Sequence, residues 1–185
     1  MNLVLAGRPV LVVGGGPVAL RKVDGLLAGG ATDVTVVAPW LVPELADRPV
    51  RLEARPYRAG EAREYRLVVV AVDDASVAQD VYDDADGEGV WVNSADDPAR
   101  CTFTLPAVVR RGDVQLTAST GGASPGLSAW LRERIEALAG PELGELAVVL
   151  AERRAAMHAA GESTEGIDWR PIIEAELARL RAVAV

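Results

Sequence analysis

The stretch Asn93–Cys101, which reads NSADDPARC, collects an amide, two carboxylates, a guanidinium and a thiol in a few residues. It follows the short apolar run Val90–Val92, which is typical of a buried strand. A carboxylate held at the end of a strand is a candidate general base, because it can accept a proton from a bound substrate. Acid–base chemistry is therefore the first activity that this stretch suggests.

The chain lacks most of the residues that other kinds of catalytic site need. A zinc dehydrogenase needs several Cys and His ligands, but the sequence has one cysteine, Cys101, and one histidine, His158. A short-chain dehydrogenase needs Tyr-x-x-x-Lys, and the only lysine is Lys22. We interpret Cys101 as a small packing residue and His158 as a surface residue. Carboxylates, hydroxyls and water remain for acid–base work.

A glycine-rich segment indicates a dinucleotide site. The apolar run Val10–Val13 is followed by Gly14-x-Gly16-x-x-Ala19, and Pro17 suits the first position of a helix. In this pattern the first glycine allows a tight turn, and the second lets a pyrophosphate approach the backbone at the helix N-terminus. We expect Gly14, Gly16, Pro17 and Val18 to contact the cofactor. The alternative is a turn with a purely structural role.

The second predicted strand ends without the acidic residue that often binds the cofactor ribose. The sequence there is Ala38-Pro39-Trp40, and no arginine that would suit a 2′-phosphate stands beside it. We therefore expect NAD as the cofactor, with groups near Pro39 and Trp40 in place of the carboxylate. Trp40 could equally be a surface or interface aromatic residue.

The hydrophobic pattern predicts the elements that carry these residues. Apolar runs alternate with helical segments up to residue 104, which indicates a parallel, doubly wound α/β sheet of Rossmann type. The predicted strands are 10–13, 34–38, 50–55, 67–72 and 90–92. One helix begins at Pro17 and ends at Gly29-Gly30, and a second runs to about Asp86. Asp74 or Ser76 can cap the second helix.

After residue 104 the pattern changes to a smaller α+β region and then to helices. Residues 106–110 and 114–119 predict an antiparallel hairpin, and helices are expected at 125–138, 141–160 and 171–182. We therefore expect a nucleotide-binding domain at 1–105, a dimerisation hairpin and helix at 106–139, and a C-terminal helical region at 140–185.

Composition narrows the choice of partners. The 185-residue chain is half apolar and carries a formal net charge of −8, which argues against nucleic acid or an anionic membrane as a partner. Its basic residues are Lys22 and eighteen arginines, which suit a carboxylate-rich ligand. The single cysteine, the absence of a signal-peptide pattern and the lack of a long apolar run lead us to expect a cytoplasmic protein.

Four motifs together resemble a known family. In chain order they are Val13-Gly14-Gly15-Gly16 with Val18-Ala19 and Arg21-Lys22, then Ala71 with Asp73-Asp74, then Asn93 with Asp96 and Pro98, and then Ser119 with Gly121-Gly122 and Ser124-Pro125. In order and spacing they are similar to precorrin-2 dehydrogenase, which is also the dehydrogenase and ferrochelatase half of siroheme synthase. The similarity runs from about residue 5 to about residue 155.

The resemblance implies a homodimer that oxidises precorrin-2 to sirohydrochlorin with NAD, for siroheme or cobalamin synthesis. Asp96 matches the family's acidic residue and is the expected general base. Asn93 is expected either to fix the loop or to hydrogen-bond the cofactor, and Asp73 either to cap the next helix or to contact the cofactor. The residues expected to bind the substrate carboxylates are Ser119, Thr120, Gly121, Gly122, Ser124 and Arg100. Some relatives also insert ferrous iron, and because no metal-ligand cluster is expected here, the macrocycle would provide the ligands.

A different class of protein fits the first half almost as well. An NAD-binding sensor module, such as the regulatory domain of an ion transporter, would need the glycine loop and the sheet. It would not need Asn93 and Asp96 joined to the segment Ser119–Pro125. Turnover of a tetrapyrrole, and not NAD binding alone, separates the two functions.

Overall fold

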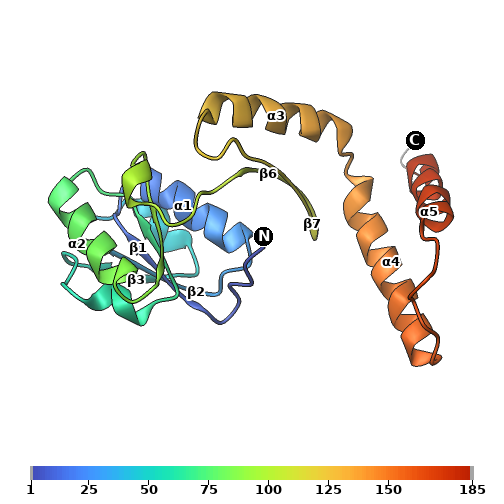
Figure 1. The fold of residues 1–185 in the computed structure, drawn as a ribbon, viewed down its shortest axis with the longest axis horizontal. Coiled ribbons are helices and arrows are strands. Elements are labelled where there is room, and N and C mark those ends of the chain that lie inside the picture. The colour runs from blue at the N-terminus through green and yellow to red at the C-terminus, as the bar shows by residue number, and fades with distance from the viewer. Residues whose placement is uncertain (1, 184–185) are drawn as a thin grey trace. The chain divides into compact units, whose positions relative to one another are not determined.

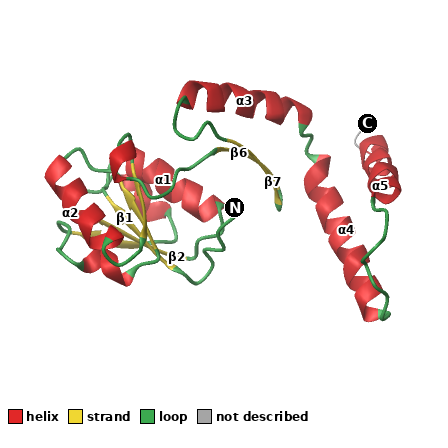
Figure 2. Cartoon of the chain, viewed as in Figure 1, coloured by secondary structure: helices red, strands yellow, loops and turns green. Residues whose placement is uncertain are grey.

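The computed structural model describes residues 2–183 and divides the chain into two compact units, 1–105 and 106–185 (Figures 1 and 2). The first unit has the same bounds as the expected nucleotide-binding domain. No helix within residues 2–183 has the length and apolar character needed to cross a membrane.

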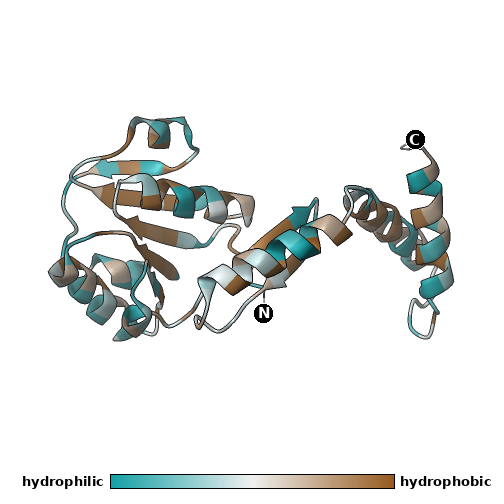
Figure 3. Cartoon of the chain, turned by 90° about the horizontal axis from the view of Figure 1, so that it is seen from above, coloured by the Kyte–Doolittle hydropathy of each residue, from teal (hydrophilic) through white to brown (hydrophobic). Residues whose placement is uncertain are grey.

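The first unit is built on a five-stranded parallel sheet, as the sequence predicts. The strands are β1 (Pro9–Val13), β2 (Asp33–Ala38), β3 (Arg51–Ala54), β4 (Leu67–Val70) and β5 (Trp91–Ser94). Their order is β3-β2-β1-β4-β5, so the chain reverses direction across the sheet after β3. The central strands are apolar throughout because both of their faces are covered, and they are mostly brown in Figure 3.

Two helices cover the two faces of this sheet and form two cores. Helix α1 (Pro17–Ala28) buries Ala19, Val23 and Leu26 on one face, and α2 (Ala75–Asp86) buries Ala78, Val81 and Ala85 on the other. The spacing of three and four residues is that of one helical stripe. Each fully buried Val or Leu contributes roughly 1.5–3 kcal/mol to folding. This rigid layer structure fixes the positions of the strand ends.

The strand boundaries differ from the predicted ones at two places that matter for the site. β4 ends at Val70, two residues early, because its partner β1 ends at Val13, which pairs with Val70. β5 continues to Ser94, because Asn93 and Ser94 pair with Val69 and Val70. Asn93 is therefore a strand residue and not part of the following loop.

Three short 3₁₀ helices were not predicted from the sequence. They are η1 (Pro43–Asp47), η2 (Glu61–Glu64) and η3 (Pro98–Arg100). A single turn gives too few residues for a hydrophobic period, so its only sequence signals are residues such as Pro43 and Pro98 in the first turn.

Within residues 106–183, the second unit contains a hairpin and three helices. Strands β6 (Ala107–Arg111) and β7 (Val114–Ala118) pair antiparallel, and the helices are α3 (Pro125–Leu138), α4 (Glu142–Ala159) and α5 (Arg170–Val183). α4 approaches the hairpin closely at Gly144, where a β-carbon would lie 3.0 Å from the backbone of Arg111. Arg111 also donates from Nε to the carbonyl oxygen of Ala139, at 2.9 Å. The hairpin is thereby joined to both α3 and α4.

Candidate active site

The glycine loop lies between the ends of three strands. Gly14 has a φ of +127°, and a β-carbon on it would overlap the carbonyl oxygen of Ala71, just beyond β4. A β-carbon on Gly15 would overlap the carbonyl oxygen of Trp40, just beyond β2. Only glycine fits at these two positions. The dinucleotide pattern assigns a role to Gly14, but it leaves Gly15 free, so this second constraint was missed.

Gly16 differs from its two neighbours because the space around it is open. It is the N-cap residue of α1, and a β-carbon on it would meet nothing within 4 Å. Pro17 takes the first position of the helix, as predicted, and has no N–H to lose. The first N–H groups of a helix lack partners inside it, so Gly16, Val18 and the helix N-terminus suit a pyrophosphate. The loop thus fits the nicotinamide dinucleotide that the sequence indicates.

The segment after β2 packs on the glycine loop through its backbone. The Val42 N–H donates to the Gly15 carbonyl oxygen at 2.8 Å, and the Trp40 carbonyl lies against Gly15. The side chains of Pro39 and Trp40 face solvent, and Trp40 is 62% exposed. Both residues therefore stand at the edge of the loop, and the indole is available for contact with a ligand or a partner. The cofactor contact expected of them stays a prediction.

Asp73 and Asp74 follow β4, and the structure separates their roles. Asp74 is the N-cap residue of α2 and accepts hydrogen bonds from the N–H groups of Ser76 and Val77. The Ser76 hydroxyl and these N–H groups lower the pKa of the Asp74 carboxyl. Asp73 is exposed beside it at the strand end. Helix capping thus falls to Asp74, and the cofactor contact expected of Asp73 stays a prediction.

Asn93 is buried and firmly oriented. Its side chain is on β5, 6% of the residue is exposed, and Nδ2 donates to the carbonyl oxygen of Phe103 at 3.0 Å. Its Oδ1 atom accepts from Nζ of Lys22, on α1, at 3.3 Å. The sequence analysis assigns Lys22 no contact with β5, so the structure adds this link between α1 and β5.

Asp96 has an unusual backbone conformation. Its φ is +57°, and it is the only non-glycine residue with positive φ within residues 2–183. The preceding residue, Ala95, donates its N–H to the Val70 carbonyl oxygen at 2.8 Å, and Val70 adjoins Ala71, the neighbour of Gly14. The exposed carboxylate is therefore presented at the same sheet edge as the glycine loop. Such left-handed residues are concentrated at functional sites.

Asp97 and Arg100 form an ion pair in the loop after β5. Asp97 precedes the turn at Pro98, but its side chain makes no capping hydrogen bond there and instead accepts from Arg100. Arg100 also donates from Nε to Oε1 of Gln79, on α2, at 2.8 Å. The guanidinium is thus already engaged, and a substrate carboxylate would have to replace one of these partners.

Cys101 holds the same loop closed, a role that the sequence did not reveal. Its sulfur accepts the Ser94 N–H at 3.2 Å and lies 3.2 Å from the carbonyl oxygen of Asp97. The backbone of Cys101 also bridges to Asn93. The turn that carries Asp96 is therefore fixed at both ends. A contact between residues this close in the chain leaves no periodic pattern in the sequence.

The predicted substrate loop belongs to the second unit, between β7 and α3. Gly121 and Gly122 have φ values of +63° and +87°, as a tight turn of small residues requires. Thr120 Oγ1 accepts the Ser124 N–H at 3.0 Å, and Ser124 Oγ accepts the Leu127 N–H at 3.2 Å as the cap of α3. Ser119 Oγ accepts the Gly121 N–H at 3.2 Å. These hydroxyls first of all shape the loop.

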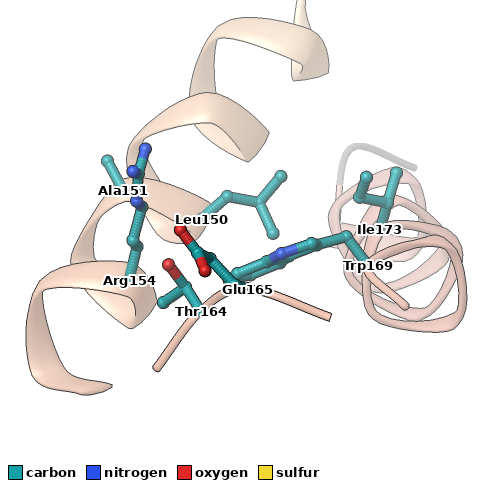
Figure 4. Close-up of a pocket in the computed structure, with 7 residues that line it drawn as sticks. All are labelled: Leu150, Ala151, Arg154, Thr164, Glu165, Trp169 and Ile173. Atoms are coloured by element: carbon teal, nitrogen blue, oxygen red, sulfur yellow. The ribbon is translucent and has the colours of Figure 1, made fainter. Parts of the chain in front are cut away.

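One pocket of the second unit lies away from the residues of the predicted substrate loop. The pocket, of about 510 Å³, lies between α4 and the segment leading into α5, with Arg154, Glu165 and Trp169 around it (Figure 4). It includes no residue that the sequence assigned to cofactor or substrate. Within residues 2–183, no three His, Cys, Asp or Glu side chains gather into a group that could hold a metal ion.

The fold and the loop define a Rossmann-type nucleotide-binding protein, and comparison with known proteins gives the family. Residues 1–107 match an NAD(P)-binding family, and residues 111–138 match the family of the central part of the sirohaem biosynthesis protein. The chain belongs to the family of precorrin-2 dehydrogenases and siroheme synthases that its motifs indicated.

Similar proteins of known name cover both units. The chain is 41% identical over 157 residues to siroheme synthase of Actinobacillus pleuropneumoniae, with 83% of this chain and 32% of that protein covered. It is 44% identical over 146 residues to siroheme synthase 2 of Aeromonas hydrophila, with 77% and 31% covered. The chain thus spans about a third of the length of these relatives. A solved precorrin-2 dehydrogenase, SirC, aligns with a TM-score of 0.76 at 28% identity, covering 98% of both chains.

Proposed function

We propose that this chain is an oxidoreductase that converts precorrin-2 to sirohydrochlorin with NAD. The observation that carries the proposal is the placement of Asp96, in a left-handed turn at the sheet edge that also holds the glycine loop. The likeness to SirC over nearly the whole chain supports the same reaction. So do the siroheme synthases that match the chain, one of them at 41% identity over 157 residues.

In the proposed reaction the macrocycle loses a hydride and a proton. The bound nicotinamide supplies the hydride acceptor, and the Asp96 carboxylate takes the proton as general base. The exposed position of Asp96 leaves it open to a large substrate, and the bonds of Ala95 and Cys101 keep the turn from moving. The rigid strand β5 thus holds the base in place during the reaction.

NAD is the cofactor that the end of β2 favours over NADP. A 2′-phosphate needs an arginine there, but Ala38, Pro39 and Trp40 give it none. The arginine that follows the neighbouring strand β3, Arg55, is paired with Glu53 and, at 2.9 Å, with Glu61. A 2′-phosphate beside these carboxylates would be repelled. Turnover measured with each cofactor should therefore show a higher kcat/KM for NAD.

The proposed partners are the tetrapyrrole and a second copy of the chain. The loop Ser119–Ser124 offers hydroxyls and N–H groups to substrate carboxylates, and Arg100 stays a candidate if it exchanges partners. Ferrous iron is proposed only as a second substrate, inserted into sirohydrochlorin. Dimerisation is supported by α3, none of whose residues is buried within one chain. A cytoplasmic location stays a prediction from the sequence.

The deciding experiment is anaerobic oxidation of freshly made precorrin-2 with NAD, followed by sirohydrochlorin absorbance. The wild-type chain should form product, and Asp96→Asn should lose at least about a hundredfold in kcat, as expected for loss of a general base. NAD binding, measured by calorimetry, should survive in the variant.

The matched control is Asp80→Asn, which removes an exposed carboxylate on α2. Its activity should equal that of the wild type. Full activity in Asp96→Asn would exclude Asp96 as the base but keep the dehydrogenase. A wild-type chain that binds NAD without any tetrapyrrole turnover would favour the sensor function instead.

A further inference from the structure

Lys22 is the only lysine of the chain, and the proposed reaction does not yet use it. Its side chain runs from α1 to β5, where Nζ donates to Oδ1 of Asn93 at 3.3 Å across 71 residues of sequence. A lysine on a surface helix normally extends into solvent, because its ammonium is strongly hydrated. Here the side chain is half-buried under the strand end that leads to Asp96.

The orientation of Asn93 shows that this contact is specific. Its Nδ2 group donates to the Phe103 carbonyl oxygen at 3.0 Å, so Oδ1 is the atom left to face α1. A buried amide oxygen needs a donor, and Lys22 provides it. Removing the ammonium would leave that oxygen without a partner and would loosen β5 three residues before Asp96.

The charges around Lys22 connect it to the proposed base. Burial lowers the pKa of the Lys22 ammonium, while the charges of Asp96 and Cys101 act to raise it and that of Arg21 to lower it. In the part of the chain that the structure describes, no carboxylate forms a direct ion pair with Lys22. Asp96 is therefore the carboxylate whose negative charge acts on the Lys22 ammonium. The hydrogen bond from Lys22 to Asn93 joins α1 to the strand that leads to Asp96.

We propose that Lys22 is a positioning residue for the dehydrogenase: its ammonium holds Asn93 and supplies the counter-charge to Asp96. The inference rests on the proposed function, because it assigns Lys22 to the same site. It requires the cationic form of Lys22. Activity should then fall at alkaline pH as Lys22 loses its proton, since burial brings that loss to a lower pH than usual.

The charge coupling can be measured without any substrate. Because the chain has one lysine, isotope-labelled lysine in the untagged protein gives one side-chain NMR signal, which reports the pKa of Lys22 directly. Asp96→Asn should move this pKa down by roughly half a pH unit, because a nearby negative charge is removed. Asp80→Asn should leave it unchanged. If the pKa of Lys22 were unchanged in Asp96→Asn, the charge interaction between Lys22 and Asp96 would be overturned, whatever reaction the protein catalyses.

Kinetics then test the role in the reaction. Lys22→Met should lower kcat about tenfold or more with little change in KM, and Lys22→Arg should restore most of the activity. The alkaline limb of the pH profile should move to higher pH in Lys22→Arg, because a guanidinium stays protonated. Cys101→Ser, measured in parallel, removes a group that raises the pKa of Lys22, so its limb should move to lower pH. A limb that moved to higher pH or vanished in Cys101→Ser would assign the titration to the thiol and overturn the proposal.

Three further results, all kinetic, would also overturn the proposal. A change in KM alone would make Lys22 a substrate contact. If Lys22→Arg were as inactive as Lys22→Met, with both variants folded and able to bind NAD, the positive charge at position 22 would not matter for the reaction. An alkaline limb at the same pH in Lys22→Arg would assign it to another group. If the wild type turned over no precorrin-2, the proposed function would fail, while the NMR titration would still decide the pairing.

Discussion

The backbone of Gly14 contacts the backbone of Ala71 so closely that no side chain fits between the end of β1 and the end of β4. Gly14→Ala must therefore push the two strands apart and also adopt a φ of +127°. We expect the free energy of unfolding to fall by about 3 kcal/mol, through strain and lost packing. Urea denaturation followed by circular dichroism measures this loss.

Gly16→Ala is the matched control for Gly14→Ala. A β-carbon at Gly16 meets no protein atom, and its φ of −86° suits any residue, so stability should change by no more than about 0.5 kcal/mol. The added methyl group would instead enter the space assigned to the pyrophosphate and weaken NAD binding. Equal destabilisation by the two substitutions, or unchanged NAD affinity in Gly16→Ala, would contradict the assigned geometry.

Asp96→Gly should separate stability from activity. The left-handed conformation of Asp96 costs free energy that glycine does not pay, so the free energy of unfolding should stay the same or rise by up to about 1 kcal/mol. Precorrin-2 oxidation should nevertheless be lost with the carboxylate. Asp96→Ala has neither the conformational freedom of glycine nor the carboxylate of Asp96, so it should be less stable than Asp96→Gly by about 1 kcal/mol. Thermal melts and the NAD assay on all three proteins test this, and an Asp96→Ala protein as stable as Asp96→Gly would refute it.

Asp84 should make the first unit sensitive to acid. It is 8% exposed, and it accepts from the Tyr57 hydroxyl and from Arg63, each at 2.8 Å, as well as from the Gly60 N–H. Burial alone would raise the pKa of its carboxyl, but these hydrogen bonds outweigh burial and lower the pKa. The resulting stability is complete above the unfolded pKa of about 4 and is lost as pH falls through the lower folded value.

Asp84→Asn tests this pH dependence. It should lower the free energy of unfolding at pH 7 by about 2 kcal/mol, because a charged acceptor of three donors is removed. Its stability should also fall less steeply than that of the wild type below about pH 4. Asp80→Asn should reproduce the wild-type acid curve. Parallel acid curves for the wild type and Asp84→Asn would show that Asp84 does not carry the effect.

Trp130 is the residue with which to test the proposed dimer. It lies on α3, is 50% exposed, and has the Arg134 guanidinium 4.9 Å from its ring centre. Large exposed aromatic groups are typical of interface centres. Trp130→Glu should shift the protein from dimer to monomer in light scattering, with a loss of affinity of tenfold or more. Trp40→Glu, an exposed Trp of the first unit, is the comparison. A dimer equally stable in Trp130→Glu would remove α3 from the interface.

The sequence by itself determined the fold class, the family, and the order and approximate bounds of the strands and α-helices. The central strands are continuous apolar runs such as Val10–Val13, and local signals such as Pro17 and Pro125 mark helix starts, so each element can be read within a few residues. The four motifs, taken together, indicated the family to which the comparisons assign the chain. All of these signals are local or depend on order along the chain.

Only the tertiary structure decided which side chains meet. The Lys22–Asn93 bond spans 71 residues, and the bonds of Asp84 join α2 to the segment before β4, so neither leaves a period or a motif. Asp96 is left-handed in a turn that the Ala95 N–H joins to β4 and that Cys101 holds at its other end. The residue types in NSADDPARC do not predict these two contacts. A sequence records the preferences of single residues and short segments, whereas packing across strands selects among them.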